Sequence, residues 1–146
     1  MAYSSEIYQS VSKILDERKR NAEHMAQLHK DEIYSLVPEL KQIDFKISRN
    51  YAKIAFSAEN PSCKNSLLEE IEKLSAEKNE IICNCGHEKE YLEPNYICKK
   101  CNDTGRTSGG HLCDCYKQLC VDEALKKLKR NAIIRRIVSL TAAQKR

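Results

Sequence analysis

Four closely spaced cysteines are the residues whose type and spacing most clearly predict chemistry. Cys98 and Cys101 form one pair, and Cys113 and Cys115 form a second pair after the polar, glycine-bearing residues 102–112. Two thiolate pairs that enter from tight turns are a usual ligand set for structural zinc, which prefers tetrahedral coordination. Four protein ligands leave no position open for a substrate. We therefore predict one structural Zn²⁺, favoured over an iron–sulfur centre that the same ligands also allow.

Other donors near this group leave two alternatives open for the ligand set. His111 offers an imidazole that would replace one cysteine, although we interpret it as a surface residue of a hairpin. Cys83, Cys85 and His87 offer three more donors, although we interpret them as the end of a helix at Gly86. The sequence alone does not separate these alternatives from the four-cysteine set.

Composition and missing motifs exclude several classes of function. The amino-terminal residues 1–10 are polar and resemble no secretory signal, and no apolar run approaches the roughly 20 residues that cross a bilayer. We therefore expect a cytoplasmic protein without a membrane partner, in a reducing compartment where clustered cysteines bind metal. The chain has no phosphate-binding glycine loop, Ser/His/Asp arrangement or zinc-protease helix, so we predict no enzyme activity and no small-molecule substrate.

Apolar periodicity predicts three helices that must position the cysteine segment. The first helix spans about residues 4–36 and ends before Pro38, since a proline disfavours helical geometry in the preceding residue. The second runs from Glu39 to about Ala58, and the third follows Asn60–Pro61 and reaches about Cys83. The apolar stripe expected on the first helix consists of Ile7, Val11, Ile14, Ala22, Met25, Leu28, Ile33 and Leu36.

The predicted fold class is mainly α, an antiparallel coiled-coil-like helical bundle followed by a small four-cysteine zinc ribbon and a C-terminal helix. In the ribbon we expect a short strand at Tyr96–Ile97 and a hairpin through Gly109–Gly110. The chain then divides into the bundle at 1–90, which is the candidate partner-docking region, the ribbon at 91–116 and a basic helix or tail at 117–146.

The final helix carries a basic run that could contact phosphate groups or form a solvated helix face. Its members are Lys126, Lys127, Lys129, Arg130, Arg135 and Arg136. They support an alternative function, a zinc-ribbon module that binds single-stranded nucleic acid, although tyrosines for base stacking are sparse nearby.

The segment Tyr-Leu-Glu-Pro-Asn-Tyr-Ile-Cys-Lys-Lys-Cys-Asn-Asp-Thr-Gly at 91–105, followed by Cys113-Asp114-Cys115, resembles a known family. It is similar to the N-terminal part of DnaC-type (DnaC/IstB-like) replicative helicase loaders of Gram-positive bacteria and their phages. The opening at residues 3–8 and the break at Pro38 are similar too, so the likeness covers about residues 1–125.

This resemblance implies a metal-binding module that engages a hexameric DnaB-type helicase, with Cys98, Cys101, Cys113 and Cys115 as the metal ligands. In such loaders an AAA+ ATPase domain follows, which binds ATP and single-stranded DNA. The present sequence reaches Arg146 without a nucleotide-binding loop. We therefore expect either a fragment of a loading factor or a natural short form that regulates or inhibits loading.

Overall fold

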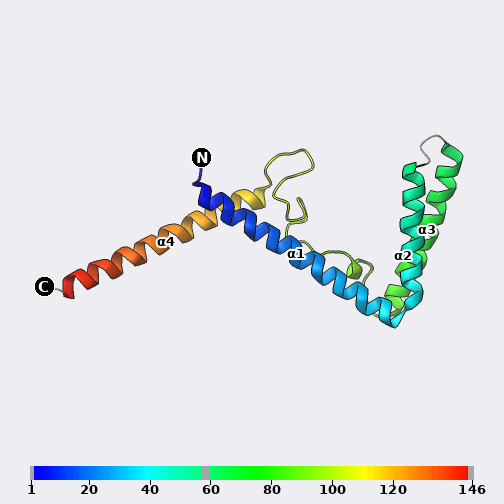
Figure 1. Ribbon diagram of the computed structural model, residues 1–146, viewed down its shortest axis with the longest axis horizontal. Coiled ribbons are helices and arrows are strands. Elements are labelled where there is room, and N and C mark those ends of the chain that lie inside the picture. The colour runs from blue at the N-terminus through cyan, green and yellow to red at the C-terminus, as the bar shows by residue number, and fades with distance from the viewer. Residues whose placement is uncertain (1, 57–59, 145–146) are drawn as a thin grey trace. The chain divides into compact units, whose positions relative to one another are not determined.

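The computed structural model describes residues 2–56 and 60–144, which are mainly helical, as the sequence predicts. In chain order the elements are α1 (Ser5–Leu36), α2 (Pro38–Phe56), α3 (Pro61–Asn84), the short 3-10 helix η1 (Lys89–Leu92) and α4 (Asp114–Gln144) (Figure 1). No helix in the described ranges has the length and apolarity to span a bilayer.

The residues form two compact units. The first unit combines Met1–Ala22 with Tyr96–Arg146, and the second consists of Glu23–Asn95. Helix α1 therefore contributes residues to both units. The division predicted from the sequence, into a bundle at 1–90, a ribbon at 91–116 and a basic helix or tail at 117–146, stays a prediction.

Both prolines that separate the first three helices lie where the sequence predicts a break. Helix α1 ends at Leu36 and α2 begins at Pro38. Pro61 opens α3, where its missing N–H leaves no hydrogen bond unmade, and Asn60 precedes it in an extended conformation. The Asn60 side chain caps no backbone N–H; its Oδ1 instead accepts a hydrogen bond from the Ser62 hydroxyl at 3.0 Å. The predicted extension of α2 to Ala58 falls outside the described residues.

In the second unit, α2 and α3 lie side by side in opposite directions (Figure 1). Leu40, Ile43 and Asn50 are buried on α2, at steps of three and seven residues that fit the heptad positions of a coiled-coil seam. At the end of this pair, Leu40 and Ile82 form a core with Ile33 of α1 and Leu92 of η1. The predicted antiparallel arrangement is thus present for α2 and α3.

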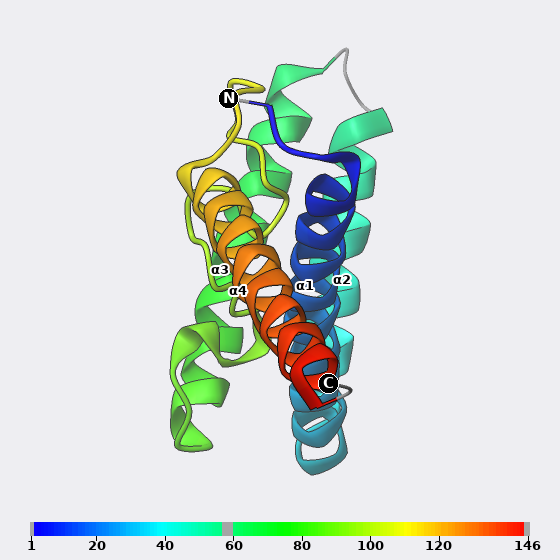
Figure 2. The same ribbon diagram turned by 90° about the vertical axis from the view of Figure 1, so that its left-hand side faces the viewer.

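In the first unit, the beginning of α1 packs against the beginning of α4 (Figures 1 and 2). Its core contains Ile7, Val11 and Leu15 from α1 together with Leu119 and Cys120 from α4. Two side-chain contacts cross the same pair of helices. The Ser10 hydroxyl donates to Glu123 at 2.8 Å, and Lys127 pairs with Glu6 at 2.7 Å.

The predicted apolar stripe of α1 is wrong at three positions in its second half, although Ile33 is buried as predicted. Met25, Leu28 and Leu36 are 49%, 47% and 68% exposed, whereas Leu15 and Ala26 are buried. Leu15 continues the row of Ile7 and Val11 by a further step of four, so that one short face of the helix meets α4. Two units share this helix, and no single stripe runs along its length.

Candidate metal centre

The first cysteine turn is built around a buried carboxylate. Asn102 and Asp103 follow Cys101 with φ values of 52° and 57°, a left-handed conformation that Asn and Asp tolerate better than most residues. This turn points the Asp103 carboxylate back at the chain. Its Oδ2 accepts the Ile97 N–H at 2.9 Å and its Oδ1 accepts the Cys98 N–H at 3.0 Å, and the residue is only 1% exposed.

A small hairpin brings the second cysteine pair back to the first. Arg106 and Leu112 form an isolated antiparallel bridge, and the Thr107 N–H donates to the His111 carbonyl at 2.9 Å. Of the two glycines predicted to close the turn, Gly110 has a positive φ of 79° and Gly109 does not. The hairpin is thus confirmed as a single bridge. The strand predicted at Tyr96–Ile97 is wrong, because Asp103 takes the Ile97 N–H that a neighbouring strand would need.

Helix α4 positions the second pair. It begins at Asp114, so Cys113 directly precedes it and Cys115 lies in its first turn. The Cys113 N–H donates to the Gly105 carbonyl at 2.9 Å, which ties the helix start to the first turn. The partial positive charge of a helix N-terminus favours thiolate over thiol, so this position suits metal-ligating cysteines.

The four sulfur atoms lie within 4.8 Å of one another. The Sγ atoms of Cys98 and Cys113 are 3.7 Å apart, and those of Cys101 and Cys115 are 3.4 Å apart. Four sulfurs at zinc–sulfur bond length in a tetrahedron are separated by about 3.8 Å, so the observed set needs only small adjustments to hold the ion. All four cysteines are free rather than joined in disulfides.

The surroundings of the four cysteines shift the pKa values of Cys98 and Cys115 in opposite directions. Hydrogen bonding from the backbone at Cys101, with smaller help from the Cys101 side chain and the backbone at Lys100, outweighs burial and lowers the pKa of Cys98 to about 7. Burial raises the pKa of Cys115, and the neighbouring thiols at Cys101, Cys98 and Cys113 raise it further. Four thiolates at this spacing repel one another, so a bound divalent cation would supply the charge that lets all of them deprotonate.

The alternative ligands are not brought to this site. His111 is exposed, and it does not belong to the four-residue group. Cys83, Cys85 and His87 lie in the other unit and form no group of metal donors. Within residues 2–56 and 60–144, the four cysteines are the single cluster of three or more His, Cys, Asp or Glu side chains that could hold an ion.

His87 has a different role in the second unit. Its ring stacks on Tyr91 with centroids 3.8 Å apart, and the other face of Tyr91 stacks on His29 at 4.1 Å. The Tyr91 hydroxyl donates to Glu32 at 3.1 Å. This stack attaches η1 to α1 and leaves neither face of Tyr91 open to a nucleic-acid base.

All six predicted basic residues lie on the exposed part of α4. Two of them are engaged: Lys126 pairs with Glu123 at 2.9 Å, and Lys127 pairs with Glu6 at 2.7 Å. These contacts lower the pKa of both carboxyl groups, in each case chiefly through the lysine hydrogen bond. The structure thus places the basic residues along one helix, where they are distributed around several sides and line no pocket among the described residues.

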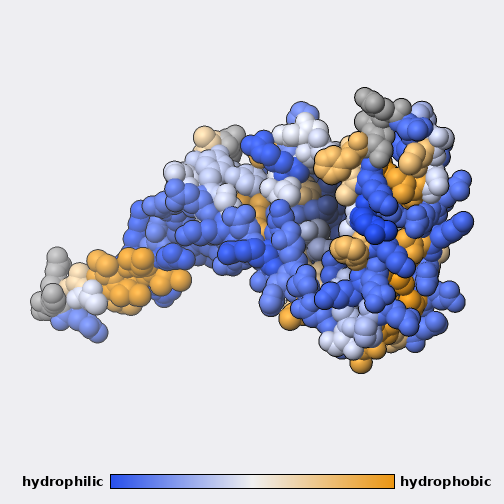
Figure 3. Space-filling view, turned by 45° about the vertical axis from the view of Figure 1, so that its right-hand side comes forward, coloured by the Kyte–Doolittle hydropathy of each residue, from blue (hydrophilic) through white to orange (hydrophobic). Residues whose placement is uncertain are grey.

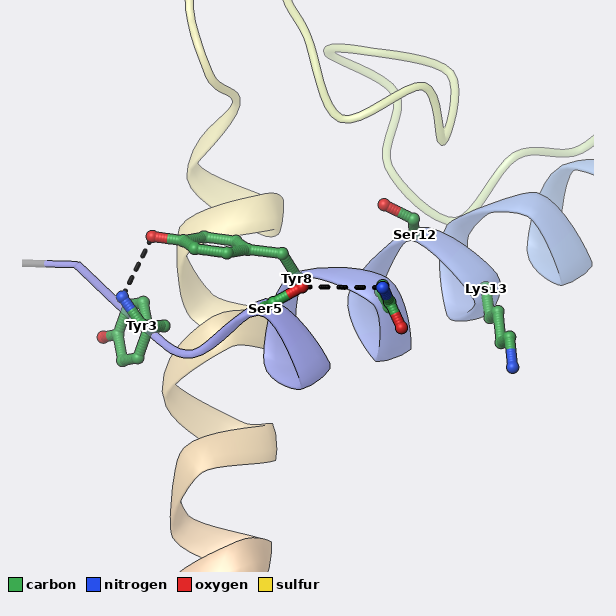
Figure 4. A pocket seen from close by; sticks show the side chains of 6 residues that line it. Tyr3, Ser5, Tyr8, Ser12 and Lys13 are labelled. Carbon is green, nitrogen blue, oxygen red and sulfur yellow. Dashed lines mark hydrogen bonds between the residues drawn. The ribbon is translucent and has the colours of Figure 1, made fainter.

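A surface hollow of about 620 Å³ lies at the beginning of α1 (Figure 4). It is lined by Tyr3, Ser5, Tyr8, Gln9, Ser12 and Lys13. The Tyr8 hydroxyl accepts the Tyr3 N–H at 3.0 Å, and the two rings meet edge to face.

Sequence reasoning missed Asp103 and Gly105, which shape the centre without being ligands. The Asn-Asp pair directly after the first cysteine pair was a usable signal, because these residues favour left-handed turns. The structure thus shows a four-cysteine centre that fits a metal ion, on a helical scaffold. Comparison of the chain with family models, with curated proteins and with solved structures gives no match.

Proposed function

We propose that this protein is a non-catalytic adaptor whose four-cysteine centre holds one structural zinc ion and fixes a partner-binding surface. The observation that supports it is the closed set of four sulfur atoms within 4.8 Å, with two of the cysteines buried. The ligands are all thiolates, which are soft donors that zinc favours, and the second turn is tied to the first by the hydrogen bond between Cys113 and Gly105.

The bound ion has a structural task in this proposal. Residues 97–113 contain one bridge pair, and few apolar side chains there are buried besides the cysteines themselves. Binding free energies of about 10–16 kcal/mol for structural zinc are large enough to order such a segment. Cys115 and Tyr116 also pack against the core of the first unit, so the centre would hold the start of α4 in place.

The proposed partner is a hexameric DnaB-type replicative helicase, and the support for it is the resemblance of residues 91–105 and 113–115 to helicase loaders. Exposed apolar side chains on α1, including Met25 and Leu28, are candidates for the contact, since amphipathic helices commonly dock through such side chains. On this proposal the protein either assists loading as part of a loader or occupies the loader site and blocks it.

The experiment has two readouts on the purified full chain. Metal analysis with native mass spectrometry should give one zinc per chain, and Cys113→Ser should abolish that stoichiometry while Cys63→Ser, an exposed cysteine, keeps it. Co-purification with the cognate helicase should give a complex at micromolar concentration, weakened by Leu28→Ser. A zinc-loaded chain that forms no such complex would contradict the helicase assignment while leaving the metal centre intact.

A single-stranded nucleic-acid module is the second proposal, supported by the exposed basic side chains of α4. The aromatic side chains nearby support it less. Tyr91 is stacked on both faces, and Tyr116 packs closely beside Gly105. Phosphate binding would weaken steeply between low and moderate salt, so a salt series with an oligonucleotide tests it directly.

A further inference from the structure

Beyond its first three turns, α4 contributes no described side chain to the core of the first unit, although Lys127 pairs with Glu6 of α1 at 2.7 Å. Every residue from Leu125 to Gln144 is exposed, although this stretch contains seven large aliphatic side chains. Figure 3 shows apolar side chains gathered on the C-terminal part of this helix, next to a hydrophilic stretch. Aliphatic side chains exposed to water do not stabilise a helix, and a contiguous patch of them commonly marks an interaction site. We therefore ask whether these side chains gather on one side of α4.

Five of the aliphatic residues share one side of the helix. They are Ile133, Ile134, Ile137, Val138 and Leu140, each between 51% and 60% exposed. At 3.6 residues per turn they cover an arc of about 160°. Together they expose on the order of 500 Å², near the upper end of the largest apolar patch found on an ordinary monomer. We call these five residues the apolar face.

Directly before the apolar face, on the same side of the helix, lies a group of four positive charges. The basic block consists of Lys126, Lys127, Lys129 and Arg130, which together with the apolar face fall within a sector of the helix about 180° wide. Within the block, Lys126 pairs with Glu123 and Lys127 pairs with Glu6. No acidic residue follows Glu123 in the sequence. One side of α4 therefore presents a basic block followed by an apolar face, whereas Leu125, Leu128 and Arg135 lie on the other side.

We propose that this side of α4 docks into an apolar groove with an acidic rim on a partner protein. The apolar face supplies anchors at Ile133, Ile137 and Leu140, which is the i, i+4, i+7 spacing of helices that lie in grooves. The basic block supplies the charge that an acidic rim complements. This surface belongs to the first unit and is independent of the helicase contact proposed on α1.

Charge and composition favour this occupant over three others. Two copies of α4 packed together would bring six basic side chains against six, with no acidic residue beyond Glu123 to offset them. A membrane-surface helix usually carries aromatic anchors, and residues 125–144 contain none. Nucleic acid would engage the basic block but would leave the aliphatic face in water.

The test uses calcium-loaded calmodulin as a defined protein probe, because its apolar grooves accept basic amphipathic helices and close when calcium is removed. We expect the full, zinc-loaded chain to bind the calcium-loaded probe and not the calcium-free probe. Because the calcium-free probe keeps its acidic side chains, this difference separates binding in an apolar groove from attraction between charges alone. The calcium-free probe is prepared beforehand, so that no chelator reaches the chain.

Two matched pairs of variants identify the side of the helix that binds. Ile137 and Leu128 are similarly exposed, at 55% and 64%, and nine residues apart they lie on opposite sides. Ile137→Ser should weaken binding by about tenfold or more, and Leu128→Ser by less than about twofold. Arg130→Ser should weaken binding and reduce its salt dependence, whereas Arg135→Ser, about 160° around the helix from Ile137, should change it little.

Several outcomes would overturn the proposal. Absence of binding to the calcium-loaded probe, equal binding to the calcium-free probe, or equal losses in the Ile137 and Leu128 variants would each do so. Tighter binding to phosphatidylglycerol vesicles would identify a membrane surface instead. A dimer in sedimentation that Ile137→Ser dissociates would identify a second copy as the occupant, and oligonucleotide binding insensitive to Ile137→Ser would identify a phosphate surface.

Discussion

The carboxylate of Asp103 accepts the backbone N–H of Cys98 at 3.0 Å, five residues back along the chain, and accepts the neighbouring Ile97 N–H at 2.9 Å with its other oxygen. One buried side chain therefore fixes the backbone at the first metal-ligand position. The carboxylate does this from a left-handed residue that only a few side chains tolerate.

Replacement of Asp103 by Asn should test this relationship. Asn tolerates the same backbone conformation, but its amide has one acceptor oxygen and directs an NH₂ group at an N–H donor. We expect Asp103→Asn to lower the free energy of unfolding by about 1–3 kcal/mol and to weaken zinc binding. Urea denaturation and zinc competition measure the two effects, and Asn102→Gly, at a neighbouring exposed position where glycine readily takes the positive φ, serves as control. An unchanged zinc affinity in Asp103→Asn would show that the two hydrogen bonds do not support the centre.

Gly105 should be far less replaceable than Gly110. Both have a positive φ, of 81° and 79°, so alanine is strained at either position. A Cβ at Gly105 would also lie 3.0 Å from Leu15 and from Tyr116, whereas a Cβ at Gly110 meets nothing within 4 Å. Gly105→Ala should therefore cost about 1–3 kcal/mol more than Gly110→Ala. Equal melting temperatures for the two variants would contradict the close packing at Gly105.

Metal removal should unfold the cysteine segment and spare the second unit. The core of that unit, which includes Ile33, Leu40 and Ile82, contains none of the four cysteines. We expect chelation to lower the melting temperature and to increase proteolysis within residues 97–113, while most of the helical circular dichroism remains. Cys113→Ser should match the chelated state, and Cys63→Ser should behave as the zinc-loaded wild type. Loss of all helical signal on chelation would show that the two units do not fold separately.

Stability of the second unit should decline at alkaline pH through Tyr34. Its hydroxyl donates to Asp44, which also pairs with Lys78, and burial followed by the Asp44 carboxylate raises the pKa of Tyr34 above its usual value. A pKa raised by folding contributes stability that is fully present below about pH 10, the ordinary tyrosine value, and is lost as pH rises through the folded value. Tyr34→Phe should flatten the fall in unfolding free energy above pH 10, and Tyr51→Phe, at an exposed position, should not. Identical pH profiles for the two variants would contradict this assignment.

Asn50 should be replaceable by leucine with a gain in stability. It is 2% exposed in the α2 seam, and its Nδ2 has no hydrogen-bond partner among the described residues. Leucine removes that unsatisfied donor, so Asn50→Leu should raise the unfolding free energy by about 1–2 kcal/mol. A buried Asn in such a seam commonly selects the pairing of the helices, so the variant is also examined for oligomers by sedimentation. A loss of stability would indicate that the amide is satisfied in solution.

The sequence by itself determined the helices, their breaks and the metal-ligand candidates. Pro38 and Pro61 act through local backbone geometry, and the cysteine spacing reflects the reach of two tight turns around one ion. Such features depend on residues close together in the chain, so local patterns were enough to predict them. The hairpin between Arg106 and Leu112 was likewise predictable from its glycines, although not which of them takes the positive φ.

Only the tertiary structure decided which faces of the helices are buried. Leu15 is buried and Leu28 exposed because α1 contributes to two units, and periodicity along one helix carries no information about which distant segment covers it. The role of Asp103 likewise depends on a backbone reversal that brings a carboxylate onto N–H groups five and six residues earlier. Burial and hydrogen bonding across such separations are properties of the folded chain, because they arise only when remote residues meet.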